Sequence, residues 1–167
     1  MVETPRRLKL HELLRVLVCM IALGTGLTLL VAAGLKLADL PAFADALQRQ
    51  HAMTEQVSEW VPAAIAAAQL TLGAIAIWFL LRHRRAEAYI TLALAFCGFT
   101  AYSAWLVSNP PTLPAPCGCG FSAGLYSVDD WRVSTLANCA FAMGFAAVAA
   151  ALSRAECTDP VSSTSLV

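Results

Sequence analysis

Residues 60–81 read WVPAAIAAAQLTLGAIAIWFLL and contain no Asp, Glu, Lys or Arg. At a helical rise of 1.5 Å per residue, about 20 apolar residues cross the roughly 30 Å hydrocarbon core of a bilayer. Lipid requires each backbone amide to be satisfied within the segment or in a closed barrel, and the run lacks the alternating pattern of a barrel strand. The stretch therefore predicts a transmembrane helix.

Three more uncharged runs of similar length complete the pattern. The four predicted spans are residues 16–35, 60–81, 88–107 and 133–153. We predict an all-α integral membrane four-helix bundle, a single domain over 1–154 followed by a disordered cytoplasmic tail over 155–167. The cations before the first span also suit a secretory signal peptide, but its apolar run exceeds the roughly 7 to 15 residues of a signal core, which favours an uncleaved helix.

The overall composition excludes two classes of function. The chain is 59% hydrophobic and 13% charged, whereas soluble domains carry about 25% charged residues, so a soluble enzyme is excluded and the lipid bilayer is the expected partner. Lys and Arg number 11, as do Asp and Glu. With no excess of positive charge, we expect no nucleic-acid partner.

The distribution of Lys and Arg predicts the orientation of the bundle. Eight of them flank the spans on one side and three on the other; the eight are Arg6, Arg7, Lys9, Arg15, Arg82, Arg84, Arg85 and Arg154. We therefore place both termini in the cytoplasm, and the loops 36–59 and 108–132 outside. In a bacterium this is an inner-membrane protein with a periplasmic Cys-Gly-Cys loop.

The outer loops contain three local signals. After Pro41, apolar residues between 42 and 60 fall on one helical face, which predicts a short helix on the membrane surface; a solvated linker is the alternative. The proline-rich stretch 109–116 is a stiff arm ending at Cys117. Asp129 and Asp130 are predicted to lie at the N-terminal end of the last span, where carboxylates complement the helix dipole.

The loop sequence Cys117-Gly118-Cys119 is the main candidate for chemistry. Thiols one residue apart close a small, strained ring, and strained disulfides are the readily reduced ones. This favours thiol exchange, while a static link or a bond to another cysteine stays open. Cys139, six residues into the predicted span and about 9 Å below its outer end, is a candidate resolving thiol or a packing residue. The remaining cysteines, Cys19, Cys97 and Cys157, are interpreted as packing residues or free thiols.

Several polar or small residues within the spans are expected to shape the bundle. Gln69 and Asn138 are predicted to hydrogen-bond between helices, with contact to the head group of a membrane quinone as the alternative. Lys36 is expected to extend to the outer interface. No metal site is expected, because a zinc site needs four ligands and no His lies near the loop thiols in sequence. Small residues predict close helix packing at Gly24, Gly26, Ala63 to Ala68, Gly73, Ala140 and Gly144.

Several short motifs resemble the MauE (methylamine-utilisation) family of DoxX-like four-helix membrane proteins over roughly residues 14–152. They are Gly34-Leu35-Lys36-Leu37, Phe43-Ala44-Asp45-Ala46-Leu47, Pro62 at the start of the second span, and Cys117-Gly118-Cys119 followed by Gly120-Phe121. The family typically has Phe before Gly after the second cysteine. It also commonly has an acidic residue in the second helix, where this chain has Gln69, which removes the carboxylate that a proton relay would use.

The resemblance implies a role in disulfide formation or transfer during maturation of the small subunit of methylamine dehydrogenase. The implied partners are a periplasmic thioredoxin-like protein or a disulfide-containing client. In that role Cys117 or Cys119 would provide the exchanging thiolate, Cys139 would resolve, and a membrane quinone would take the electrons, which makes the chain a candidate thiol–disulfide oxidoreductase. The main alternative is a non-catalytic membrane scaffold or chaperone with a structural Cys-Gly-Cys disulfide. A permease is disfavoured because the spans contain no charged residue.

Overall fold

The computed structural model describes residues 5–50, 60–110 and 128–158, and within these ranges all the regular structure is helical. The helices are α1 (Pro5–Ala38), α2 (Leu40–Arg49), α3 (Val61–Leu81), α4 (Arg85–Ser108) and α5 (Val128–Thr158). Four of them contain segments long and apolar enough to cross a membrane: Glu12–Ala38, Val61–Leu81, Arg85–Ser108 and Asp129–Arg154. The predicted all-α architecture with four spans is confirmed.

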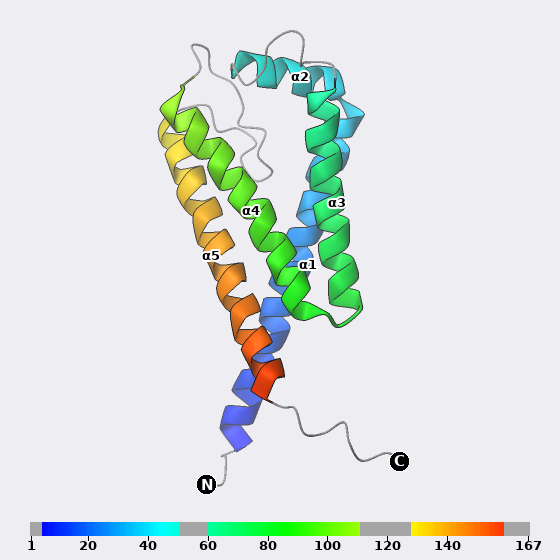
Figure 1. The fold of residues 1–167 in the computed structure, drawn as a ribbon, viewed down its shortest axis with the longest axis vertical. Coiled ribbons are helices and arrows are strands. Elements are labelled where there is room, and N and C mark those ends of the chain that lie inside the picture. The colour runs from blue at the N-terminus through cyan, green and yellow to red at the C-terminus, as the bar shows by residue number, and fades with distance from the viewer. Residues whose placement is uncertain (1–4, 51–59, 111–127, 159–167) are drawn as a thin grey trace.

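The four long helices run along the long axis of the molecule, and α2 lies across one end (Figure 1). We call this the α2 end; the opposite end, where the described parts of α1 and α5 begin and finish, is the terminal end. α1 and α4 both finish at the α2 end. α3 and α5 both begin there. The turn between α3 and α4 lies at the terminal end.

Local capping explains where α2 begins. Asp39 is its N-cap, and the side-chain oxygen accepts a hydrogen bond from the Ala42 amide at 3.2 Å. Pro41 occupies the first turn, where its missing amide hydrogen costs nothing. Phe43 and Leu47 are buried on the inner face. A helix is therefore confirmed for the first part of the predicted region, whereas its continuation over 51–59 lies outside the described residues and its position on the membrane surface stays a prediction.

The last span is longer than predicted at both ends. α5 begins at Val128, five residues before the predicted start, with Asp129 and Asp130 in its first turn as predicted. There Asp129 pairs with Arg132 at 3.1 Å, one turn along. At the other end the helix continues through 155–158, so these four residues are not part of a disordered tail. Their sequence, Ala-Glu-Cys-Thr, offers no Gly or Pro to stop the helix.

Two glycines allow α1 and α3 to approach closely. A Cβ added at Gly73 would lie 3.1 Å from the Gly26 carbonyl oxygen, and one added at Gly26 would lie 2.9 Å from Ile77 Cγ1. The prediction of close packing is confirmed at these two positions. It is wrong for Gly24 and Gly144, where an added Cβ would meet nothing within 4 Å, and Ala140 is exposed, because these residues face away from neighbouring helices.

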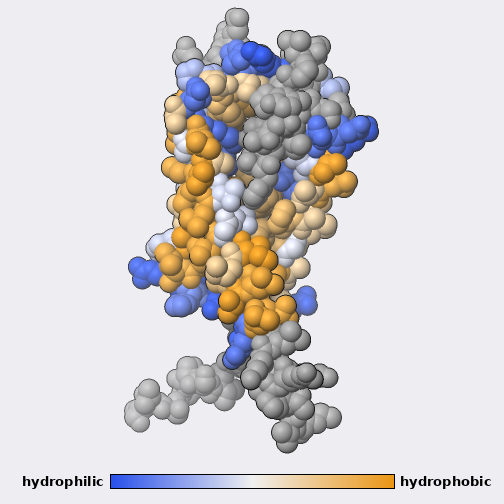
Figure 2. All heavy atoms as spheres, turned by 180° about the vertical axis from the view of Figure 1, so that it is seen from behind, coloured by the Kyte–Doolittle hydropathy of each residue, from blue (hydrophilic) through white to orange (hydrophobic). Residues whose placement is uncertain are grey.

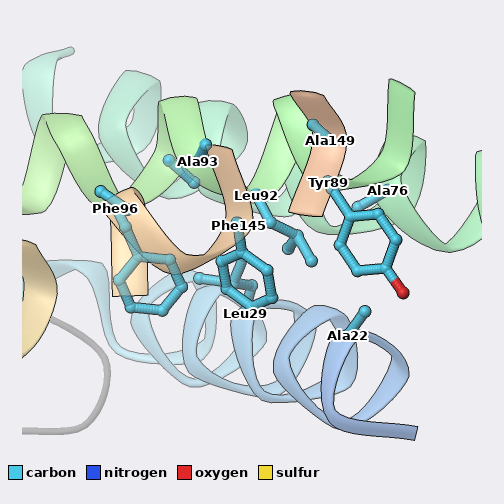
Figure 3. Close-up of a cluster of buried hydrophobic side chains, with 11 residues drawn as sticks. Ala22, Leu29, Ala76, Tyr89, Leu92, Ala93, Phe96, Phe145 and Ala149 are labelled. Carbon is cyan, nitrogen blue, oxygen red and sulfur yellow. The ribbon is translucent and has the colours of Figure 1, made fainter. Parts of the chain in front are cut away.

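Aromatic rings join α4 to α5. The ring centroid of Phe96 lies 5.2 Å from that of Phe141 and 5.9 Å from that of Phe145, and Tyr89 stacks on Phe145 at 6.1 Å. In Figure 3 the rings of Phe96, Phe145 and Tyr89 form a row above α1, whose Leu29 lies against them. Aromatic pairs at these separations add to the stabilisation that comes from burial alone. The central core therefore contains an aromatic cluster shared by α4 and α5.

The outward surface of the long helices is apolar. Figure 2 shows hydrophobic residues over the middle of the molecule and hydrophilic residues towards both ends. Large aliphatic side chains are widely exposed, among them Leu35 at 68%, Leu81 at 72% and Leu136 at 71%. Exposed apolar area on this scale exceeds what soluble monomers tolerate. A surface of this kind is stable in contact with lipid acyl chains.

Candidate functional site

Cys117 and Cys119 lie outside the described residues, in the segment between α4 and α5. The described ends of that segment are the C-terminus of α4 at Ser108 and the first residue of α5 at Val128. Both are at the α2 end of the bundle (Figure 1). The segment that contains the Cys-Gly-Cys sequence therefore joins α4 to α5 at the α2 end of the bundle.

Cys139, the candidate resolving thiol, is a half-buried free cysteine in α5. It lies eleven residues after Val128, which corresponds to about 16 Å along the helix axis. The sequence predicts a separation of about 9 Å between Cys139 and the start of the helix. The separation in the structure is longer because α5 begins earlier than predicted. A loop thiol must reach further down the bundle to meet this sulfur.

Two more cysteines are free thiols, as predicted. Cys19 in α1 is half-buried, and Cys97 in α4 is exposed on the surface of its helix. Cys157 lies within α5. Within the described ranges, no group of three or more His, Cys, Asp or Glu residues is placed to hold a metal ion.

Lys36 of α1 and Gln69 of α3 form a polar contact between helices near the α2 end. The Lys36 Nζ donates a hydrogen bond to Gln69 Oε1 at 2.6 Å, and Gln69 is 3% exposed. The predicted interhelical role of Gln69 is confirmed. Lys36 lies in the last turn of α1, and its contact with Gln69 was not predicted; that it extends to the outer interface stays a prediction.

The orientation of the Gln69 amide follows from that contact. An ammonium group only donates hydrogen bonds, so the amide oxygen must face Lys36 and the amide nitrogen must point elsewhere. That nitrogen, Nε2, is buried and has no hydrogen-bond partner among the described residues. A buried donor without an acceptor is costly, so a ligand oxygen in reach of Nε2 would be bound favourably.

The short helix α2 is tied to this polar contact and to α4. The Lys36 Nζ lies 5.1 Å from the ring centroid of Phe43, within the range of a cation–π interaction. At the C-cap of α2, Gln50 is 1% exposed, and its Oε1 accepts a hydrogen bond from the Tyr102 hydroxyl. We did not predict the contact between Gln50 and Tyr102; the two residues are far apart in sequence, and neither carries a motif.

A cavity of about 290 Å³ lies among α1, α2, α3 and α4 at this end of the bundle. Lys36, Gln69 and Tyr102 are its polar lining residues. The apolar lining is Leu29, Phe43, Leu47, Ile65, Ala68, Leu72, Leu94, Ala95, Gly98 and Phe99. The cavity was not predicted either, since no local sequence signal marks an internal space between four helices.

Asn138, the second polar residue predicted to bond between helices, bonds within its own helix. It is 6% exposed, and its Nδ2 donates to Ser134 Oγ at 3.4 Å, one turn earlier in α5. The prediction of a bond across the bundle is wrong for Asn138 because Ser134 offers a local acceptor. Asn138 does not line the cavity, so the polar groups around this space come from the other helices.

The family comparison agrees with the geometry. The family model described as methylamine utilisation protein MauE matches residues 14–153, a range that includes α2, α3 and α4 entirely and most of α1 and α5. No curated protein and no solved structure matches the chain. The predicted resemblance is confirmed: this multi-pass membrane protein, associated with methylamine utilisation, belongs to the MauE family.

Proposed function

We propose that the protein supports maturation of a periplasmic client by thiol–disulfide exchange at Cys117 and Cys119, from the inner membrane of a bacterium. The observation that carries the proposal is the presence of the Cys-Gly-Cys sequence between two membrane spans of a MauE-family chain. In the proposed orientation this connection lies on the periplasmic side, where a client protein would meet the two thiols. The client is a thioredoxin-like protein or another disulfide-containing protein.

The positions of the cations support an outward-facing α2 end. Arg82, Arg84 and Arg85 lie in and beside the turn between α3 and α4 at the terminal end. Arg15 and Arg154 lie on the parts of α1 and α5 near the same end. Because cytoplasmic loops are enriched in Lys and Arg, this distribution favours cytoplasmic termini and a periplasmic α2 end.

The exchange step balances without a metal or a bound cofactor. A client thiolate attacks one sulfur of a Cys117–Cys119 disulfide; the bond between the two breaks, and a mixed disulfide forms as the other sulfur leaves as a thiolate. The client's second thiolate then attacks the mixed disulfide. The client gains a disulfide, and the protein retains two reduced thiols. Cys139 is a candidate third thiol that would resolve a trapped mixed disulfide.

Differential alkylation in intact membranes tests the proposal. We expect a Cys117–Cys119 bond to be reduced by mild reductant while the protein stays folded, and to re-form on oxidation. Either single variant, Cys117→Ser or Cys119→Ser, should accumulate a mixed disulfide that mass spectrometry assigns to a periplasmic protein. Cys97→Ser is the matched control, because Cys97 is a free, exposed thiol on α4.

The opposite results would favour the scaffold function. If the bond resists mild reductant in the folded protein, or if the two thiols never oxidise, exchange is excluded. Loss of the folded protein in the double variant Cys117→Ser/Cys119→Ser would indicate a structural disulfide. Activity lost with the fold intact would support exchange.

A further inference from the structure

The cavity at the α2 end has a polar side formed by hydrogen-bond donors. Gln69 is 3% exposed, and its Nε2 is a buried donor with no partner among the described residues. Next to it, the Lys36 ammonium donates to Gln69 Oε1 at 2.6 Å and places a positive charge beside the amide. A buried amide donor beside a positive charge favours a ligand that brings an acceptor oxygen.

The rest of the cavity is apolar and suits a flat ring. Phe43 of α2, Phe99 and Tyr102 of α4 contribute aromatic rings to its lining. The volume of about 290 Å³ lies at the lower end of the roughly 300–1,000 Å³ typical of small-molecule sites. One substituted ring fits such a space, whereas a long isoprenoid chain does not.

The lining also reaches the lipid-facing surface. Leu94 of α4 is 62% exposed and Ile65 of α3 is 37% exposed, and both line the cavity. In the membrane these side chains face acyl chains. A ligand whose head occupies the cavity could therefore extend an apolar tail between α3 and α4 into the bilayer.

We propose that this cavity binds the head group of a lipid-soluble quinone, with a carbonyl oxygen accepting a hydrogen bond from Gln69 Nε2 beside the positive charge of Lys36. A quinone carbonyl has acceptor lone pairs and no donor of its own, which matches the buried amide donor. Its planar ring matches the aromatic lining, and its tail matches the lipid-facing opening. A fatty acid carboxylate shares the acceptor chemistry but lacks the ring.

The purpose of the ligand rests on the proposed function, although its binding does not. Two reduced cysteine thiols would pass two electrons and two protons to the quinone, which forms the disulfide and a quinol. As electrons reach the quinone, negative charge develops on its oxygen. The Lys36 ammonium and the Gln69 amide are placed to stabilise that charge.

A binding experiment on the full chain in lipid nanodiscs tests the proposal, with a radiolabelled short-chain benzoquinone as the probe. We expect saturable binding, and an increase in Kd of about tenfold in each of Gln69→Leu and Lys36→Met, since the first removes the buried donor and the second removes the adjacent positive charge. Thr71→Val is the matched control in α3: Thr71 is exposed, and its hydroxyl bonds to the Ala67 carbonyl one turn earlier. Its Kd should equal that of the unmodified protein.

A steric variant keeps the test decisive if a polar variant fails to fold. Gly98 lines the cavity, and a Cβ added there meets nothing within 4 Å. Gly98→Leu should therefore fold and fill the space, and it should abolish probe binding. Gly24→Leu is its matched control, because Gly24 is equally open but does not line the cavity.

The possible outcomes separate this inference from the proposed function. Absence of saturable binding, or unchanged binding in Gly98→Leu, would overturn it. Lys36-dependent binding of laurate without binding of the benzoquinone would also overturn it and assign the cavity to an anionic lipid. The double variant Cys117→Ser/Cys119→Ser should bind the probe normally. Failure of thiol exchange would therefore leave quinone binding intact, and failure of quinone binding would leave exchange open.

Discussion

The α2 end and the centre of the bundle are built differently, although α1, α3 and α4 contribute to both. At the centre, α4 and α5 are joined by stacked rings around Phe96, and α1 lies on α3 at Gly26 and Gly73 with no space for a Cβ. At the α2 end the helices enclose a cavity of about 290 Å³ and contribute buried polar groups such as Gln69. The centre provides stability, and the α2 end retains the space and the donors needed for a ligand.

The largest expected effect on stability comes from truncating a side chain in the central core. Phe96→Ala removes a fully buried ring that contacts the rings of Phe99, Phe141 and Phe145, and it should lower the free energy of unfolding by about 3–5 kcal/mol. Phe99→Ala is the comparison, since Phe99 is only partly buried and borders the cavity; its cost should be smaller. Denaturant titration in detergent micelles measures both. Equal losses in the free energy of unfolding would contradict the distinction between the aromatic centre and the α2 end with its cavity.

The next effect tests the close contact of α1 with α3. Gly73→Ala places a Cβ 3.1 Å from the Gly26 carbonyl oxygen and 3.2 Å from Leu29 Cβ, so it should destabilise the protein by about 1–3 kcal/mol. Gly98→Ala meets no neighbouring atom. It should be neutral or stabilising by up to about 1 kcal/mol, because Ala is the better helix former. A stable Gly73→Ala variant would show that the two helices can separate freely.

A smaller effect concerns the polar contact at the α2 end. A double-mutant cycle with Lys36→Met and Gln69→Leu should give a coupling energy of about 0.6–1.7 kcal/mol, the range of interhelical polar pairs in membranes. The double variant should be more stable than the sum of the single effects predicts. A coupling energy of zero would indicate that the hydrogen bond at 2.6 Å contributes nothing to the folded state.

The smallest effect lies in the turn at the terminal end. His83 has a φ of 59°, in the left-handed region where a side chain is disfavoured. His83→Gly should raise the free energy of unfolding, because glycine adopts this conformation without steric cost. The gain should be about 1 kcal/mol or less, because glycine loses more conformational entropy on folding than histidine does. Thermal unfolding followed by circular dichroism can detect the shift. A lower transition temperature would contradict the expected strain at His83.

The sequence predicted the helices well and the contacts between their side chains poorly. The uncharged runs located four spans, Pro41 marked the first turn of the short helix α2, and Asp129 fell in the first turn of α5. Gln69 bonds between helices as predicted, but sequence position did not show that its partner is Lys36. The prediction for Asn138 was wrong, because Ser134 offers an acceptor within its own helix. The aromatic core was not anticipated, since a membrane helix is apolar on all sides and no polar face marks the side that packs.

The sequence by itself determined that this chain has four membrane spans, and it indicated the MauE family, confirmed over residues 14–153. These properties depend on hydrophobic length and short motifs, which are local. Only the tertiary structure decided that the Gln69 amide is buried beside Lys36, that Tyr102 bonds to Gln50, and that a cavity separates the helices there. Such contacts depend on how each helix is rotated about its axis, which side-chain packing sets and hydrophobicity alone does not.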